Sequence, residues 1–176
     1  MDAAKACGAS GIGLFRSEFL FMESLENPSE ERQFTVYRQV LEAMAPKPVT
    51  IRTIDIGGDK MVSGLGIDEK NPILGWRAVR FCLSRKDIFT VQLRALLRAS
   101  VYGKLQVMFP MISGVEELNA VLHLFEHVKD ECRRESIPFD PDIKVGTMIE
   151  VPSAALCADI LAKKVAHDSV TGLLNR

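Results

Sequence analysis

Apolar residues recur along the chain with two different spacings, which predict strands and helices in alternation. Short apolar runs of strand length lie near residue 11 and at 49–56, 105–111 and 144–149. In the stretches between them, apolar residues recur every three to four positions, which predicts amphipathic helices at 29–45, 79–97, about 115–135 and 153–164. No hairpin signal joins two of the strands. The pattern therefore predicts an α/β protein whose parallel sheet is built from β-α-β units.

Local signals mark the ends of several predicted helices. Ser29 is a typical N-cap residue for the helix at 29–45, and Pro46 and Pro48 cannot continue that helix. Ser113 lies just before the helix at 115–135, and Ser153 lies at the start of the last one. We expect these helices to begin and end close to the residues that carry the signals.

The run 49–56 stands out because two charged residues interrupt an otherwise apolar strand. Arg52 and Asp55 lie inside it, and Gly57 and Gly58 end it. Charged side chains are rarely buried unless they are paired, so this strand predicts an ion pair, an anion site or both. A purely structural Arg–Asp pair explains the pattern as well as a binding site does.

Ligands of parallel α/β folds bind at the carboxyl ends of the strands. The charged residues expected near those ends are Arg16, Arg52, Asp55, Arg77 and Glu150. The three arginines should converge on one rim, where their guanidinium groups suit a phosphate or a carboxylate. Glu150 is a candidate ligand of Mg²⁺, which usually takes one or two carboxylates besides water and substrate oxygens. Together they indicate phosphoryl transfer. In the alternative, Glu150 pairs with one of the arginines and the rim is only structural.

Composition excludes several classes of partner. The 176 residues are 47% hydrophobic and 26% charged, with a net charge of −1, which is typical of an ordinary globular protein. No Lys/Arg block points to nucleic acid or to an anionic membrane surface. No apolar run has transmembrane length and no signal peptide is evident, so we expect a cytoplasmic protein. The four cysteines have no C-x-x-C spacing, so we expect free thiols rather than disulfides or a zinc site.

Two further patterns resemble functional motifs only superficially. The glycines at 8–13 match neither Gly-x-Gly-x-x-Gly nor the Lys-Ser/Thr ending of a phosphate loop. His123 and His127 share a face of a predicted helix but lack the order of the zinc-protease motif and a third ligand. We expect both histidines on a solvated helix face.

Six segments of the chain match the motifs of a known enzyme family in amino-acid sequence and in order along the chain. They lie at 11–22, 52–60, 71–80, 93–100, 107–112 and 148–154. These segments resemble Enzyme I of the bacterial phosphoenolpyruvate:sugar phosphotransferase system, and the likeness extends over about 8–165. Pyruvate phosphate dikinase and phosphoenolpyruvate synthase belong to the wider family, but the Ile-Gly-Gly-Asp-Lys segment at 56–60 is closer to Enzyme I.

The resemblance implies a phosphoenolpyruvate-binding (β/α)₈ barrel. In that family the arginines that match Arg16, Arg52 and Arg77 contact phosphoenolpyruvate, and the glutamate that matches Glu150 ligates Mg²⁺. The intact family passes the phosphoryl group to a histidine in another domain and then to the carrier protein HPr during sugar uptake. These are the positions to which the strand ends already pointed.

The chain also departs from the family pattern. A complete barrel has about 250 residues, whereas this chain has about four of eight strands, so we expect one partial barrel domain over 1–176. The family continues into a Gly-Thr-Asn-Asp motif with a second Mg²⁺ ligand, but here 166–176 diverges. The proton-donating cysteine, the phosphohistidine domain and the HPr-docking region have no match. We therefore expect an internal piece of Enzyme I that is inactive alone.

Open sheet edges in a partial barrel predict that the chain self-associates or pairs with Enzyme I subunits. An alternative function is a non-catalytic module that binds an anion or serves subunit assembly. A dikinase-type relative would need a nucleotide-binding domain encoded elsewhere.

Overall fold

The computed structural model describes residues 8–22, 27–57 and 75–165 of the chain. Its sheet has four parallel strands in the order of the sequence. They are β1 (Ile12–Arg16), β2 (Pro48–Arg52), β3 (Lys104–Phe109) and β4 (Lys144–Thr147). A parallel sheet in which each strand lies beside the next one in sequence is the arrangement found in a (β/α)₈ barrel. The predicted α/β class is confirmed, and the arrangement is that of a partial barrel of this type.

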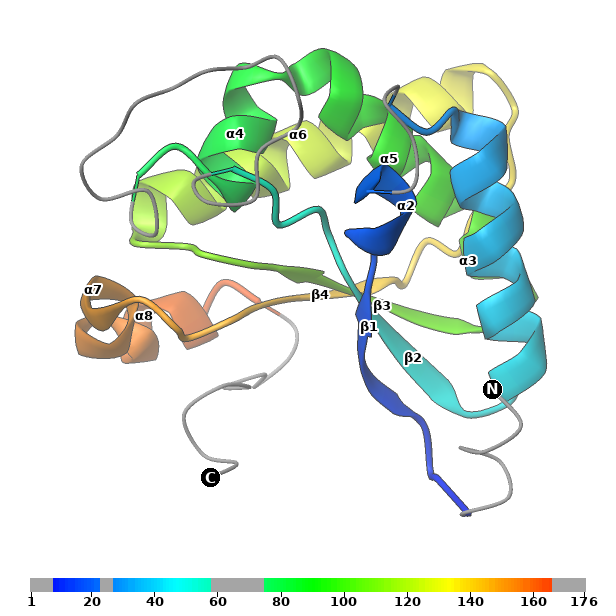
Figure 1. Ribbon diagram of the computed structural model, residues 1–176, viewed down its shortest axis with the longest axis horizontal. Coiled ribbons are helices and arrows are strands. Elements are labelled where there is room, and N and C mark those ends of the chain that lie inside the picture. The colour runs from blue at the N-terminus through cyan, green and yellow to red at the C-terminus, as the bar shows by residue number, and fades with distance from the viewer. Residues whose placement is uncertain (1–7, 23–26, 58–74, 166–176) are drawn as a thin grey trace.

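Helices connect the strands and cover one side of the sheet. The helices are α2 (Phe19–Met22), α3 (Glu30–Met44), α4 (Ala78–Ser84), α5 (Lys86–Ala99), η1 (Ser100–Tyr102), α6 (Val115–Arg134), α7 (Pro152–Leu156) and α8 (Ala158–Ala162). Helices α3, α4, α5 and α6 form a layer on one side of the strands, while α7 and α8 follow the end of β4 (Figure 1). In the part of the chain that the structure describes, no helix is long and apolar enough to cross a membrane.

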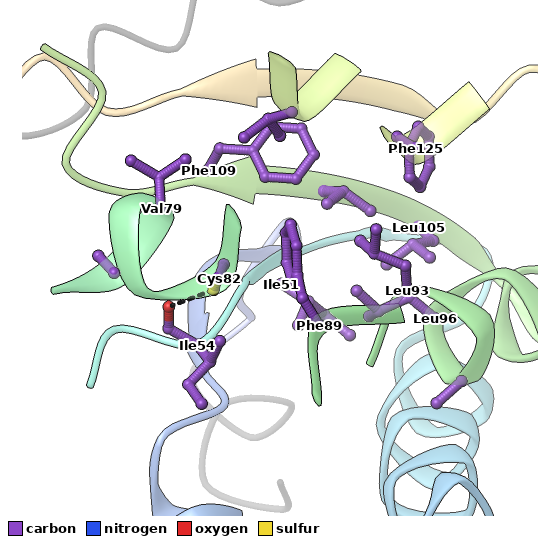
Figure 2. Close-up of a cluster of buried hydrophobic side chains, with 14 of the residues drawn as sticks. Ile51, Ile54, Val79, Cys82, Phe89, Leu93, Leu96, Leu105, Phe109 and Phe125 are labelled. Carbon is purple, nitrogen blue, oxygen red and sulfur yellow. Dashed lines mark hydrogen bonds between the residues drawn. The ribbon is translucent and has the colours of Figure 1, made fainter. Parts of the chain in front are cut away.

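The main core lies between the sheet and this layer of helices. Phe109 of β3 is fully buried, and its ring packs edge-on against Phe89 of α5 and Phe125 of α6, with ring centres 6.4 and 6.2 Å away. Figure 2 shows these rings with Ile51 of β2 and neighbouring aliphatic side chains. Because successive residues of a strand point to opposite faces, the residues next to Ile51 point away from this core. One of those neighbours is Arg52.

Helix α3 has the cap that its sequence predicts. The Ser29 hydroxyl accepts a hydrogen bond from the backbone N–H of Arg32 at 3.2 Å. Glu30 and Glu31 lie in the first turn, where the helix dipole favours negative charge. The helix ends at Met44, just before Pro46. The start and the stop of this helix are therefore confirmed.

Two predicted helices differ from the observed ones at their ends or in their interiors. The helix expected at 79–97 is two helices that meet at Arg85, whose backbone is not helical (φ −112°, ψ 60°). Asp87 lies in the first turn of the second helix and binds Arg85, which favours a new helix start. The expected helix 153–164 begins at Pro152 and breaks at Cys157. Helix α6 begins at Val115, as predicted; its N-cap is Gly114, without a side-chain hydrogen bond, and Ser113 lies just before it.

The strand predicted at 49–56 is shorter than expected. Strand β2 ends at Arg52, although Ile54 and Ile56 remain buried. The backbone N–H of Thr53 still bonds the carbonyl oxygen of Met108 on β3, at 2.9 Å. The next N–H, that of Ile54, instead bonds the side-chain Oε1 of Gln92 on α5, at 2.8 Å. The chain therefore leaves the sheet under a helix, which explains why its residues stay apolar beyond the strand.

Candidate functional site

The first two arginines of the candidate site lie side by side at the carboxyl edge of the sheet. Arg16 is the last residue of β1 and Arg52 the last residue of β2, and the two are register partners in the parallel pair. Arg16 is exposed, whereas Arg52 is 7% exposed. The predicted convergence of these two strand ends is thus present in the backbone.

Asp55 brings the third arginine to the same place. Its Oδ1 accepts hydrogen bonds from Arg77 Nη2 at 2.8 Å and from Arg77 Nε at 3.2 Å. Its other oxygen, Oδ2, lies 3.4 Å from Arg52 Nη1. All three side chains are about nine-tenths buried. The buried ion pair that the sequence predicts therefore exists, and one carboxylate holds two arginines.

Backbone contacts place Arg77 beside the segment that follows β2. Gly57 and Arg77 form an isolated antiparallel bridge, and the N–H of Ala78 bonds the carbonyl oxygen of Ile56 at 2.9 Å. Gly57 has a φ of +121°, and a Cβ atom there would lie 2.5 Å from the carbonyl oxygen of Trp76. Only glycine permits both the conformation and this close approach. Gly57, which the sequence marks as the end of the run, thus allows Arg77 to reach Asp55.

Glu18 is a member of the cluster that the sequence analysis did not identify. It lies just after β1 and its carboxylate forms a buried ion pair with the guanidinium of Arg52. The only signal was an acidic residue two positions after Arg16, at the end of a strand. Arg52 is therefore held by two carboxylates, and its orientation is fixed before any ligand binds.

The paired groups of the cluster balance in charge, and the exposed Arg16 lies beside them. Arg52 and Arg77 are paired with the carboxylates of Glu18 and Asp55, while Arg16 is the register partner of Arg52 and forms none of these ion pairs. Within the Arg52–Glu18 pair, the donor Arg52 Nε and the acceptor Glu18 Oε2 are both buried without a hydrogen-bond partner. A buried donor without a partner costs free energy, so an anion that accepts from it would be favoured. The carboxyl edge of the sheet thus presents one exposed guanidinium, that of Arg16, beside a buried donor, Arg52 Nε.

Glu150 lies at the same edge, beyond the end of β4, and binds backbone rather than an arginine. Its Oε1 accepts a hydrogen bond from the N–H of Met111 at 2.8 Å. Met111 follows β3 and adopts a left-handed backbone conformation with φ of 60°. Among the residues that the structure describes, no ion pair joins Glu150 to an arginine. The structural alternative in which Glu150 neutralises the rim is therefore not observed.

Glu150 is placed so that its carboxylate can serve as one protein ligand of a magnesium ion. Within 8–22, 27–57 and 75–165, no group of three or more His, Cys, Asp or Glu residues is arranged to hold a metal. Glu150 uses one oxygen for the Met111 N–H and is partly exposed, so its carboxylate is accessible at the edge. Because Mg²⁺ often takes one or two carboxylates and completes its shell with water and substrate oxygens, this geometry is compatible with Mg²⁺.

The loop that presents Met111 to Glu150 is fixed by a second polar cluster. Arg80 Nη1 lies 3.2 Å from Glu117 Oε1 and donates to the carbonyl oxygen of Met111 at 3.4 Å. The other oxygen of Glu117 accepts from the N–H of Ser113 at 2.7 Å. These contacts tie α4 and α6 to the loop after β3. They hold the backbone that orients the Glu150 carboxylate.

The remaining sequence candidates lie away from this chemistry. His123 and His127 are exposed on α6, as predicted. Cys82, Cys132 and Cys157 are free thiols, also as predicted, while Cys7 is outside the described residues. Burial raises the pKa of Cys82 well above its usual value, so this thiol stays neutral inside the core.

Comparison with known proteins places the chain in a family. The sequence model of the family described as "PEP-utilising enzyme, PEP-binding domain", where PEP is phosphoenolpyruvate, matches residues 1–171. A phosphoenolpyruvate-protein phosphotransferase of Haemophilus influenzae is 53% identical over 170 residues, which is 96% of this chain and 30% of that protein. Proteins of the same name from Staphylococcus aureus and Priestia megaterium are each 49% identical over 164 residues, or 93% of this chain.

The similarity covers nearly all of this chain but only part of each relative. The chain spans about 30% of the length of the curated proteins that it matches. The family match includes the strands, the charged cluster and Glu150. The chain therefore belongs to the family of PEP-utilising enzymes and corresponds to part of their PEP-binding domain.

Proposed function

We propose that this chain binds PEP at the carboxyl edge of its sheet, with Arg16, Arg52 and Arg77 around the phosphate and carboxylate groups. The observation that supports this most strongly is the charged cluster, in which the exposed Arg16 lies beside two fixed arginines and the buried Arg52 Nε has no hydrogen-bond partner. PEP has two anionic groups, and planar guanidinium groups bind both kinds in a bidentate manner.

The three arginines have different parts in this proposal because their surroundings differ. Arg52 and Arg77 are buried and already held by carboxylates, so little side-chain entropy is lost when they meet a ligand. Arg16 is exposed beside Arg52 and is free to close on the anion from the solvent side. Two fixed guanidinium groups would orient the ligand, and the exposed one would complete its neutralisation.

We also propose that Glu150 supplies one carboxylate ligand of Mg²⁺, with PEP oxygens and water completing the shell. When bound, the ion would offset the negative charge of the phosphate during transfer. The hydrogen bond from Met111 leaves the second oxygen of Glu150 available, which supports this role. The part played by the chain itself is to hold that carboxylate beside the arginine cluster.

The complete protein is proposed to be a PEP-protein phosphotransferase of the Enzyme I type. The names of the relatives, which are 49% to 53% identical, support this reading. The phosphoryl group would pass to a histidine and then to HPr for sugar uptake, through parts of the relatives that lie outside the matched third. Within this scheme 1–176 is one partial barrel domain, inactive alone, that works in the cytoplasm, where free cysteines such as Cys82 are usual. Strands β1 and β4, each with one neighbour in the described sheet, support association with another copy or with Enzyme I subunits.

Isothermal titration of the chain with PEP, in the presence and absence of Mg²⁺, tests the proposal. The informative variant is Arg16→Ala, because Arg16 is exposed and its removal should leave the fold intact. A lost charge-assisted hydrogen bond should weaken PEP binding by about tenfold or more. Arg134→Ala is the matched control, since Arg134 is an exposed arginine at the far end of α6 from this edge.

A second variant isolates the metal ligand. Glu150→Gln keeps an oxygen that can accept from the Met111 N–H but loses the negative charge. It should abolish the increase in PEP affinity that Mg²⁺ produces while leaving the metal-free affinity unchanged or higher. If the folded wild-type chain does not bind PEP, or if Arg16→Ala and Arg134→Ala bind it equally well, the proposal is wrong. The alternative of an assembly module without an anion site would then be favoured.

A further inference from the structure

A buried side-chain network lies directly behind the arginine cluster and is not part of the proposed binding groups. Its centre is Gln92 of α5, which is completely buried. The side-chain Nε2 donates to Ser17 Oγ at 3.0 Å and to the Tyr37 hydroxyl at 3.0 Å, and Oε1 accepts from the Ile54 N–H at 2.8 Å. Both amide hydrogens and the amide oxygen of Gln92 therefore have partners.

The network holds the end of β2 from two sides. On one side, the Ser17 hydroxyl donates to the carbonyl oxygen of Arg52 at 2.8 Å. On the other side, Gln92 Oε1 accepts a hydrogen bond from the N–H of Ile54, which no longer bonds to the sheet. Between these contacts the Thr53 N–H is bonded to β3. The two successive peptide groups that join Arg52, Thr53 and Ile54 are thus fixed, in the segment from which Arg52 and Asp55 project.

The chemical identity of Gln92 matches this arrangement. A primary amide can accept one hydrogen bond and donate two at the same time, which neither a carboxylate nor an aliphatic side chain can do. Its donation to Ser17 leaves the single Ser17 hydrogen for the Arg52 carbonyl. The direction of each hydrogen bond in this part of the network is therefore determined by the amide.

We propose that Gln92 is a positioning residue for PEP binding, which acts through Ser17 and the Ile54 N–H to hold Arg52 and Asp55 in place. This inference rests on the proposed function, because it concerns the geometry of the same arginine cluster. Gln92 itself does not touch the ligand. Loss of its amide would allow the end of β2 to move and would misalign guanidinium groups whose binding depends on orientation.

A matched set of variants separates positioning from simple stabilisation. Gln92→Met keeps a long unbranched side chain but removes all the hydrogen bonds of the amide. Ser17→Ala releases the Arg52 carbonyl and removes one acceptor of the Gln92 amide, but it leaves the Ile54 N–H bonded to Gln92. It serves as the test variant if Gln92→Met does not fold. Tyr37→Phe is the control, since the Tyr37 hydroxyl contacts the side chains of Gln92, Gln33 and Ser17 but no backbone at the end of β2. All are made in the full chain, and each is compared at a temperature where circular dichroism shows it folded.

Two readouts are measured on each variant: PEP affinity by titration calorimetry, and the ¹⁵N-detected Nε–H resonance of Arg52 without ligand. We expect Gln92→Met and Ser17→Ala to weaken PEP binding by about tenfold and to shift the Arg52 resonance. Tyr37→Phe should lower stability but leave both readouts as in the wild type. Wild-type affinity in folded Gln92→Met and Ser17→Ala, with an unmoved Arg52 resonance, overturns the inference.

The second readout keeps the two proposals distinguishable. If the wild-type chain does not bind PEP, the proposed function fails, and the Arg52 resonance alone decides whether Gln92 positions that side chain. A shift in Gln92→Met and Ser17→Ala but not in Tyr37→Phe supports positioning. No shift in any variant, or an equal shift in all three, contradicts it.

Discussion

Replacing Asp55 by asparagine should destabilise the protein strongly, because this one carboxylate neutralises two buried arginines. Its oxygens lie 2.8 Å from Arg77 and 3.4 Å from Arg52, and its side chain is 6% exposed. Removing one partner of a buried ion pair costs about 3–5 kcal/mol. Arg52 keeps Glu18, and the asparagine oxygen can still accept from Arg77, so we expect the lower end, about 3 kcal/mol. For a protein of this size that corresponds to a fall in Tm of about 6–12 °C.

Urea denaturation followed by circular dichroism and by the fluorescence of Trp76 measures this change. Trp76 is the only tryptophan and precedes Arg77, so its emission reports on the same region. The control is Asp87→Asn, in which the same substitution breaks the exposed two-bond pair with Arg85. Exposed pairs contribute little, so this variant should unfold at nearly the wild-type urea concentration. If Asp55→Asn were as harmless as Asp87→Asn, the cluster would be open to water and the reasoning would be refuted.

Three further predictions concern the helices and the sheet edges. Ser29→Ala removes the N-cap of α3 and should lower the free energy of unfolding by about 1 kcal/mol in urea titrations, while Ser29→Asp should restore most of it. Hydrogen bonds from Arg94 lower the pKa of Glu135 below its ordinary value of 4.5. The ion pair between Arg94 of α5 and Glu135 at the end of α6 therefore stabilises the fold fully above pH 4.5. The stability difference between wild type and Glu135→Gln should therefore shrink as pH falls through the lowered pKa of Glu135, and a difference constant from pH 7 to 3 would contradict this. Light scattering should show self-association that increases with concentration, because β1 and β4 each have one neighbour in the described sheet; a monomer at every concentration would disprove it.

The general arrangement of the site could be predicted from sequence because a rule of the fold class fixes it. Parallel strands bring their carboxyl ends to one edge, so Arg16 and Arg52 were expected together without any knowledge of contacts. Arg77 follows no strand; its backbone bridge to Gly57 brings it to Asp55, where it meets Arg52. Glu18 was missed because its ion pair with Arg52 spans 34 positions in the sequence and has no periodic signal.

The network around Gln92 was not predictable for a related reason. Gln92 is a polar residue between Val91 and Leu93 in an amphipathic helix, and such a residue is normally expected on the solvated side. Its burial follows from the backbone of Ile54, which leaves the sheet under α5. The apolar pattern at 49–56 could not show this departure, since Ile54 and Ile56 are buried whether or not they belong to a strand.

The most direct test of the central claim is to observe the arginine side chains themselves while PEP and Mg²⁺ are added. Their Nε–H resonances can be assigned in ¹H–¹⁵N spectra of the full chain by single Arg→Lys variants. We predict saturable shifts for Arg16, Arg52 and Arg77, with one common Kd, and no shift for Arg134 at the end of α6. Unchanged resonances of Arg16, Arg52 and Arg77 in a folded chain, or shifts of Arg134 of the same size, would show that this edge of the sheet is not a PEP site.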